Sequence, residues 1–192
     1  MTRSLPRLPE RVAGDDGLLL RRLEVGDAET LDTAVRESLD HLRPWMAWIA
    51  EEPLTIARRR KLLAQWERDW RAGDDVILGV FMDDELVGSS GLHHRIGPDG
   101  LEIGYWVHPG FTRRGIATRV SALLTRAAFE TTPIGRVEIH TDRANVASSG
   151  VPHKLGFALL EEVSREPQAP GEAGVEQRWR LTRAEAAVLG RI

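Results

Sequence analysis

The stretch at 101–118, LEIGYWVHPGFTRRGIAT, constrains the fold most, because it predicts a strand, a sharp break and a helix in direct succession. The stretch begins with mainly apolar and aromatic residues, as a buried strand does, and His108-Pro109-Gly110 then interrupts them. Apolar residues return at helical spacing beyond Gly115, so we expect a helix with one buried face. The residues that would form this face are Ile116, Val120, Leu123, Leu124 and Ala127.

The start of this predicted helix has the features of a phosphate site. The amides of a first helical turn have no partner inside the helix, and the helix dipole adds positive potential there. Gly115 and Ala117 are small enough to let a ligand approach the backbone, and Arg113 and Arg114 add positive charge. Thr112 is a candidate cap, whose hydroxyl would accept from one of the free amides. Together these features indicate that the turn binds a phosphate group.

Two familiar phosphate motifs do not fit this stretch. A Walker loop ends in Gly-Lys-Ser or Gly-Lys-Thr, and no such ending occurs here. A dinucleotide fingerprint needs G-x-G-x-x-G, and Gly110 and Gly115 lie too far apart to supply it. A plain crossover from strand to helix, without a ligand, is the alternative interpretation.

Strands and helices are mixed along the chain, with an antiparallel meander in the middle. This order predicts an α/β or α+β fold, in which helices cover both faces of a sheet. Residues 1–16 would form an arm or a short edge strand, and the 192 residues suit one domain. Gly150 and Pro152 predict that the helix at 145–155 either kinks or begins properly near Val151. The expected strands lie at 17–25, 76–82, 85–94, 101–107, 136–141, 157–165 and 175–181, and the expected helices at 28–41, 55–70, 115–131, 145–155 and 183–189.

Composition excludes several classes of function. The absence of cysteine rules out a disulfide framework, a thiolate metal site and a cysteine acyl-enzyme. The formal charge of -3 argues against a general nucleic-acid binder, and no apolar run is long enough to span a bilayer. The six histidines show no H-x-x-x-H or similar spacing, so we expect no metal. Without an apolar leader, the sequence predicts a cytoplasmic protein that binds neither nucleic acid nor membrane.

Three motifs in the second half of the chain resemble those of one superfamily. TRRGIAT at 112–118 resembles the pyrophosphate loop, Q/R-x-x-G-x-G/A, of the GNAT superfamily of acyl-CoA-dependent N-acyltransferases, with Thr112 in place of the frequent Gln or Arg. EIGYWVHP precedes it, and NVASSGVPHKLGF at 145–157 follows it at the usual distance. Together they resemble the Rim-like branch, whose best-known members acetylate protein N-termini.

The resemblance implies a fold and a reaction. The fold would be a single acyl-CoA N-acyltransferase domain with a mixed, mainly antiparallel, twisted sheet. Its two central strands, 101–107 and 136–141, would splay apart to admit the pantetheine arm. The reaction would be direct attack of a primary amine on acetyl-CoA, the co-substrate, in a ternary complex without an acyl-enzyme. The pyrophosphate would be held by Arg113, Arg114, Gly115, Ile116, Ala117 and Thr118, with Arg119 within reach of the outer phosphate.

Glu102 is the candidate general base, acting through a water. Alternation along the strand places it on one face with Gly104 and Trp106, opposite Leu101, Ile103 and Tyr105. A carboxylate in a central strand is unusual because burying charge is costly. Glu102 also matches the acid that the Rim-like branch carries in this strand. The alternative is that it pairs with an arginine or reaches water near the start of the strand.

Two further positions on this segment would contact the donor. The backbone amide of Val107 would bind the thioester oxygen, and the resemblance implies a bulge in the strand that turns this amide toward the cleft. His108 lies at the mouth of the expected cleft and would touch CoA.

Ser148 is the candidate for protonating or hydrogen-bonding the leaving thiolate. NVAS at 145–148 resembles the N-x-x-S of the family, so Asn145 would bind the pantetheine arm. Asn145 could equally cap the helix, and the two roles are compatible. Ser149 is the neighbouring alternative to Ser148, and Tyr105 is an alternative acid.

The acceptor side is less defined. Trp45 and Trp48 fall where the family builds its acceptor wall, and His93 or His94 would line the pocket or act as an alternative base. The acceptor would be a protein or peptide α-amine, or a small-molecule amine such as a polyamine, amino sugar or antibiotic. A catalytically silent CoA-binding module on the same fold is the alternative function, and a homodimer is one option for assembly.

Overall fold

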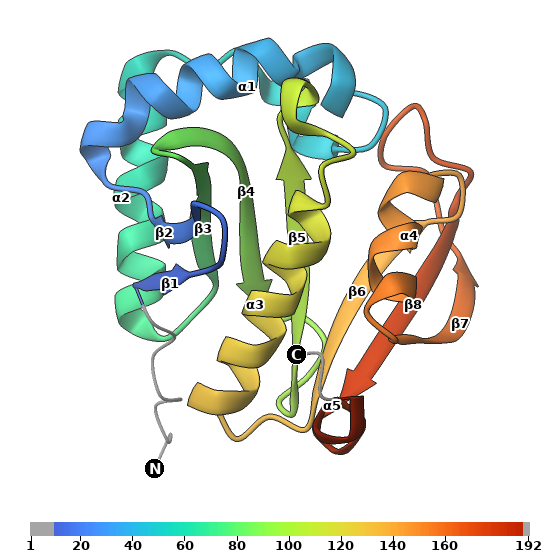
Figure 1. The fold of residues 1–192 in the computed structure, drawn as a ribbon. Coiled ribbons are helices and arrows are strands. Elements are labelled where there is room, and N and C mark those ends of the chain that lie inside the picture. Colours follow the sequence, from blue (N-terminus) through green and yellow to red (C-terminus); the bar gives the residue numbers. More distant parts are fainter. Residues whose placement is uncertain (1–9, 190–192) are drawn as a thin grey trace.

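Eight strands form one sheet in residues 10–189, the part of the chain that the computed structural model describes (Figure 1). Their order is β1-β2-β3-β4-β5-β6-β8-β7, and every neighbouring pair is antiparallel except β5 with β6. The expected mixed, mainly antiparallel sheet is therefore confirmed. The strands are β1 (Arg11–Ala13), β2 (Leu18–Arg22), β3 (Val76–Met82), β4 (Glu85–His93), β5 (Gly100–Val107), β6 (Arg136–Asp142), β7 (Ala158–Ser164) and β8 (Val175–Thr182).

Helices cover both faces of this sheet, as expected. In Figure 1, α3 and α4 lie in front of the sheet, α2 lies behind it, and α1 runs across the end where β5 stops. No described helix is long and apolar enough to cross a membrane. The α-helices are α1 (Ala28–Leu42), α2 (Ile56–Ala72), α3 (Ile116–Thr131), α4 (Val146–Lys154) and α5 (Arg183–Leu189), and three unexpected 3-10 turns are η1 (Val25–Asp27), η2 (Ala47–Glu51) and η3 (Pro109–Phe111).

The N-terminal segment follows one of its two expected forms. Within 10–16, β1 pairs antiparallel with β2 and forms the edge of the sheet. Residues 1–9, which belong to the same expected arm, lie outside the described part of the chain.

The two faces of β5 belong to two separate hydrophobic cores. Leu101 and Ile103 pack in the core that includes the buried face of α3. Trp106 packs in a second core with residues of α1 and α2. The predicted alternation along this strand is therefore confirmed, and β5 lies between the two layers of helices.

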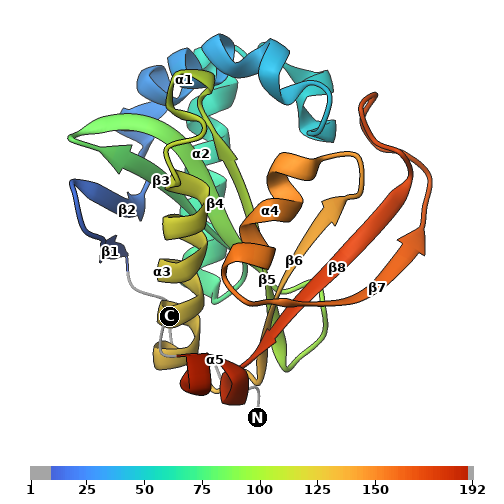
Figure 2. The same cartoon turned by 45° about the vertical axis from the view of Figure 1, so that its right-hand side comes forward.

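The pairing of β5 with β6 ends soon after it begins. Their parallel register runs from Gly100↔Arg136 to Glu102↔Glu138, although both strands continue beyond it. Figure 2 shows the two strands diverging toward the end covered by α1. The expected splay is confirmed, and its base is the Glu102↔Glu138 pair.

A side chain of β5 bridges this splay to α4. Pro152 lies inside α4, and because proline has no amide hydrogen, the carbonyl of Ser148 loses its donor four residues on. The Tyr105 hydroxyl donates to this carbonyl instead, over 3.1 Å.

The helix α4 begins directly after Asn145, whose side chain accepts from the Ser148 amide at 3.1 Å, so the expected start near Val151 is wrong.

A buried arginine holds α1, η2 and α2 together. Arg59 of α2 is 2% exposed, and its guanidinium lies 2.8 Å from Oε1 of Glu52 and 3.2 Å from Oδ1 of Asp32. Because these carboxylates come from the segment after η2 and from α1, the group fixes the position of the helices over Trp106.

Arg59→Met is expected to lower the free energy of unfolding by about 3–5 kcal/mol, because it leaves Asp32 and Glu52 without their shared buried partner. Arg60→Met, the same substitution one residue on, removes only an exposed pair with Glu29 and is expected to cost about 0–1 kcal/mol. Urea unfolding of both variants measures the difference. Equal costs would show that the buried group contributes no more than a surface pair.

Tyr105→Phe is expected to cost about 1–3 kcal/mol of unfolding free energy, because the Ser148 carbonyl loses its donor. Pro152→Ala supplies a helical amide to the same carbonyl, so the double variant is expected to cost less than the two single changes together. Denaturant unfolding of all four proteins gives the coupling energy. Strict additivity would contradict the exchange of donors described above.

Candidate active site

Two buried glutamates lie side by side where the splay begins. Glu102 and Glu138 are 6% and 4% exposed, and isolated carboxylates would be costly at such burial. Arg95 compensates for the burial of the Glu102 charge. Its Nε lies 2.7 Å from Oε2, and its guanidinium donates a second hydrogen bond to Oε1. Arg136 and Arg180 lie 3.1 and 2.9 Å from Oε1 of Glu138. Glu102 therefore pairs with an arginine, which was the alternative to a free carboxylate.

The cluster keeps its charges. Burial alone would raise the pKa of Glu138, but hydrogen bonds from His140, Arg180 and Arg136 outweigh it and hold that pKa below its usual value. The hydrogen bond to Glu102 raises the pKa of Arg95, against the opposing effect of burial. Both the Glu138 carboxylate and the Arg95 guanidinium therefore stay ionised near neutral pH.

Histidines from the two neighbouring strands flank Glu102. His93 pairs with Glu102 across β4 and β5, and its Nδ1 lies 2.7 Å from Oδ2 of Asp75. Its ring covers Gly104, where an added Cβ would come within 3.3 Å of Nε2. On β6, Nε2 of His140 lies 2.8 Å from Glu138. No sequence pattern predicted a role for His140, although alternation along β6 places it on the same face as Glu138.

The amide of Val107 points into the splay without a bulge. The register of β4 with β5 is continuous from His93↔Glu102 to Gly88↔Val107, so the expected bulge is absent from these pairs. The His108 amide donates to the Val87 carbonyl at 2.8 Å, which makes His108 part of a hydrogen-bonded pair. Since such pairs alternate, the Val107 amide faces away from β4, toward the space that β6 has left.

No side chain caps α3 in the described part of the chain. Gly115 precedes the helix in the left-handed conformation, with φ 75°, and an added Cβ there would meet nothing within 4 Å. The Thr112 hydroxyl donates to the Pro109 carbonyl at 3.0 Å, so the expected cap is wrong. The first-turn amides of Ile116, Ala117 and Thr118 are thus left without a capping side chain.

The arginines around this turn differ in direction. Arg113 is exposed and has a positive φ of 62°. Arg114 donates to the Gly110 carbonyl at 3.0 Å and lies over the Phe111 ring, 4.8 Å from its centroid. Arg119 faces the N-terminal half of the chain, where it contacts Met82. Arg113 and Arg114 therefore lie at the turn, whereas Arg119 is directed away from it.

The two serines of α4 contact different strands of the sheet. Oγ of Ser148 lies 3.1 Å from the Tyr105 hydroxyl of β5. Oγ of Ser149 instead lies 2.9 Å from Oγ1 of Thr141 and 2.8 Å from Oε1 of Gln177. Burial raises the pKa of Tyr105 to about 12, against a smaller lowering by Ser148, so the phenol stays protonated. Ser148 is therefore the serine that contacts β5, the strand that carries Glu102.

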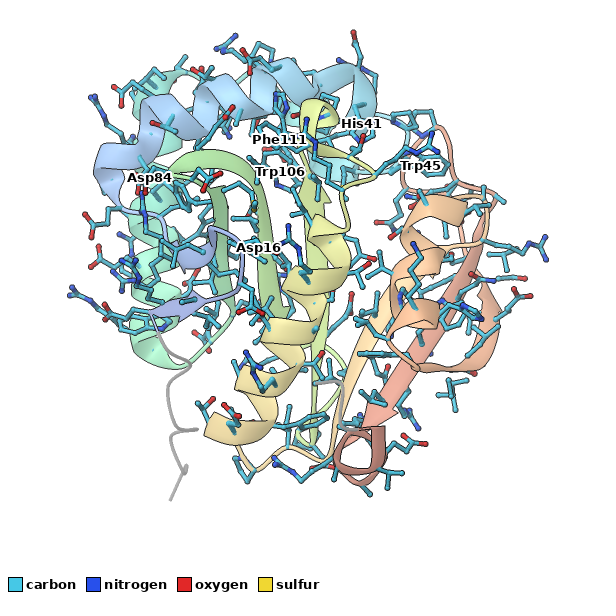
Figure 3. All side chains as sticks on the ribbon, viewed as in Figure 1. Asp16, His41, Trp45, Asp84, Trp106 and Phe111 are labelled. Atoms are coloured by element: carbon cyan, nitrogen blue, oxygen red, sulfur yellow. The ribbon has the colours of Figure 1, made fainter. Side chains whose placement is uncertain are left out.

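Aromatic side chains gather where β5 ends beneath α1. Figure 3 shows Trp45, Trp106 and Phe111 at this end of the molecule, beside His41. Trp48 is 39% exposed, and its ring centroid lies 6.4 Å from that of Trp106. These rings form an aromatic wall next to the splay, in which Trp106 is buried and Trp48 is exposed.

Two contacts frame this aromatic end. Nε2 of His108 lies 3.1 Å from Glu37 of α1, and its Nδ1 accepts from the Gly110 amide at 3.1 Å. In the loop between β7 and β8, the Gly171 amide donates to the Pro44 carbonyl at 2.8 Å. The His108 ring is thus held by protein groups, and the two halves of the chain meet beyond the splay. The described residues contain no group of three or more His, Asp or Glu suited to a metal ion.

Comparison with known proteins gives consistent matches. Residues 17–158 match the family model described as Acetyltransferase (GNAT) domain. The chain is 31% identical over 150 residues to "Putative ribosomal N-acetyltransferase YdaF" of Bacillus subtilis (strain 168), covering 77% of this chain and 80% of that protein.

Solved structures share the fold. The chain is 26% identical to one described as a probable acetyltransferase, with a TM-score of 0.83 over 91% of this chain and 98% of the other. RimL, a ribosomal L7/L12 alpha-N-protein acetyltransferase in complex with coenzyme A, superposes with a TM-score of 0.84 at 20% identity, over 92% of this chain and 99% of that one. With the family match and YdaF, these likenesses show that the chain belongs to the GNAT acetyltransferases, in their Rim-like branch.

Proposed function

We propose that this chain transfers the acetyl group of acetyl-CoA directly to a primary amine, in a ternary complex without an acyl-enzyme. The observation that carries the proposal is the divergence of β5 from β6 between the Glu102 carboxylate and the uncapped start of α3. A thioester and a phosphate group each find matching chemistry there. The relatives YdaF and RimL, named as N-acetyltransferases, support the same reaction.

The diphosphate of the donor lies on the first-turn amides of α3. Gly115, Ile116, Ala117 and Thr118 supply the backbone, and the exposed Arg113 and Arg114 add positive charge. The pantetheine arm then extends through the splay past Asn145, with His108 at its mouth. This path leads the thioester to the Val107 amide, whose direction suits a developing oxyanion.

Catalysis requires the acceptor ammonium to lose two protons, one to a base before the attack and a second that reaches the thiolate as the amide forms. Glu102 removes the first through a water, because most amines are protonated near neutral pH. The free amine attacks the thioester carbon, the Val107 amide stabilises the oxyanion, and the C–S bond breaks. The Ser148 hydroxyl, paired with the protonated Tyr105 phenol, donates its proton to the leaving sulfur and takes up the second proton of the attacking nitrogen.

An α-amine of a protein or peptide fits the acceptor site better than a polyamine. A polycation needs carboxylates without partners, whereas Glu102 and Glu138 are already paired with arginine. An α-amine has a reference pKa of about 7.7–8.0, so much of it is neutral near pH 7.5. Trp45, Trp48 and His93 form the acceptor wall in this proposal, with Trp48 exposed for contact.

Gly115→Asp is expected to weaken acetyl-CoA binding at least about tenfold, because it adds a negative charge beside the diphosphate. Gly73→Asp is the matched control: it also has a positive φ, 81°, and open space at Cβ, but ends α2. Its donor affinity should equal that of the unmodified chain. Calorimetry with acetyl-CoA measures both, and equal affinities for the two variants would remove the phosphate site from α3.

Glu102→Gln is expected to lower kcat by about 10²–10⁴-fold while acetyl-CoA still binds, because general base catalysis is lost. Glu162→Gln, an exposed glutamate of β7, is the control. The assay follows thiol release from acetyl-CoA with N-terminal peptides and with a small-amine library. Unchanged turnover in Glu102→Gln would exclude this base; donor binding without thiol release from any amine would identify a silent CoA-binding module.

A further inference from the structure

His140 has no part in the mechanism above, yet it lies beside the proposed base. It follows Glu138 by two residues on β6, so both side chains project from one face of the sheet. Because the pairing of β5 with β6 ends at Glu102↔Glu138, His140 lies one step further into the splay. Its side chain is 15% exposed. The ring is therefore largely enclosed while keeping some access to water.

The two ring nitrogens of His140 face different carboxylates. Nε2 lies 2.8 Å from Oε2 of Glu138. Nδ1 lies 3.5 Å from Oε2 of Glu102 and 3.7 Å from Oε1 of Glu176. An ionised carboxylate only accepts, so the hydrogen bond to Glu138 places the proton of the neutral ring on Nε2. The basic nitrogen that remains, Nδ1, is directed at Glu102.

Each carboxylate around His140 is already held by a guanidinium. The ring therefore faces carboxylates that are fixed in place, and imidazole is the one group in this cluster of a type that titrates between pH 5 and 8. The pairs are Glu102 with Arg95, Glu138 with Arg136 and Arg180, and Glu176 with Arg165 and Arg178.

We propose that His140 completes a proton relay, taking from Glu102 the proton that Glu102 removes from the acceptor amine. The inference rests on the proposed function, since it requires Glu102 to act as the base. The ammonium of the acceptor loses a proton to the Glu102 carboxylate through a water. Glu102 passes that proton to Nδ1 of His140, which restores the carboxylate. The imidazolium keeps the proton on Nε2, which stays hydrogen-bonded to Glu138, and releases the proton on Nδ1 to solvent.

The relay removes a mismatch that Glu102 alone would face. Reference pKa values are about 4.3 for a glutamic acid and about 7.7 for an α-amine, so a carboxylate is a weak acceptor for this proton. Imidazole, with a reference pKa of about 6.5, lies closer to the amine.

The test is His140→Gln, which keeps a donor for Glu138 but cannot take up a proton. We expect kcat with saturating acetyl-CoA and peptide to fall about 10²-fold, with both KM values little changed. In a plot of kcat against pH, the acidic limb, where kcat falls as the pH is lowered, should move to lower pH, because only a carboxylate then accepts the proton. His153→Gln, the same change at an exposed histidine of α4, should keep the original kcat and limb.

Chemical rescue separates a proton carrier from a structural side chain. Added imidazole should raise the kcat of His140→Ala and leave that of Glu102→Gln unchanged, because the relay needs both members. Circular dichroism and acetyl-CoA affinity establish that each variant is folded. If His140→Gln does not fold, rescue of His140→Ala decides the question.

The possible outcomes distinguish the relay from the proposed function. The relay is overturned if His140→Gln keeps a normal kcat. It is also overturned if kcat is lost while the acidic limb stays at its original pH and imidazole does not rescue His140→Ala. In either case, thiol release by the unmodified chain still upholds the proposed function. If the unmodified chain releases no thiol from any acceptor, both proposals fall. A reduced rate with a shifted limb and imidazole rescue supports the relay.

Discussion

The end of the parallel pairing between β5 and β6 is the constraint on which the site depends. After Glu102↔Glu138 the two backbones separate, so main-chain groups that a sheet would pair become available, including the Val107 amide. The same geometry brings two carboxylates together at the point of separation. Because that position is buried, it also requires arginines, and Arg95, Arg136 and Arg180 supply them.

Backbone groups in α3 and α4 that lack a hydrogen-bond partner inside their helix lie around the proposed site. Pro152 withholds an amide from the Ser148 carbonyl, and the Tyr105 phenol that takes its place also meets the Ser148 hydroxyl. At α3, Gly115 leaves the first turn uncapped, whereas Thr55 caps α2 and Asn145 caps α4. Both features arise from single residues whose backbone behaviour is unusual. The groups they leave available lie along the path proposed for the donor.

Local patterns predicted most of the fold, since the order of elements and the alternation along β5 depend on neighbours in sequence. The Thr112 cap failed because its hydroxyl satisfies the Pro109 carbonyl inside η3, a turn that the pattern did not reveal. The position of His140 beside Glu102 depends on which strands lie adjacent, and β6 is distant from β5 in sequence. Such contacts follow from topology, so residue types alone could not locate them.

The hydrogen bond between Gly171 and Pro44 joins the loop between β7 and β8 to the segment that follows α1. Asp142 anchors that loop to β6 by accepting from the amides of Ala173, Gly174 and Val175. The two segments approach so closely at Gly171 that an added Cβ would come within 2.7 Å of Pro44. Any residue other than glycine at this position would therefore push the two halves of the chain apart.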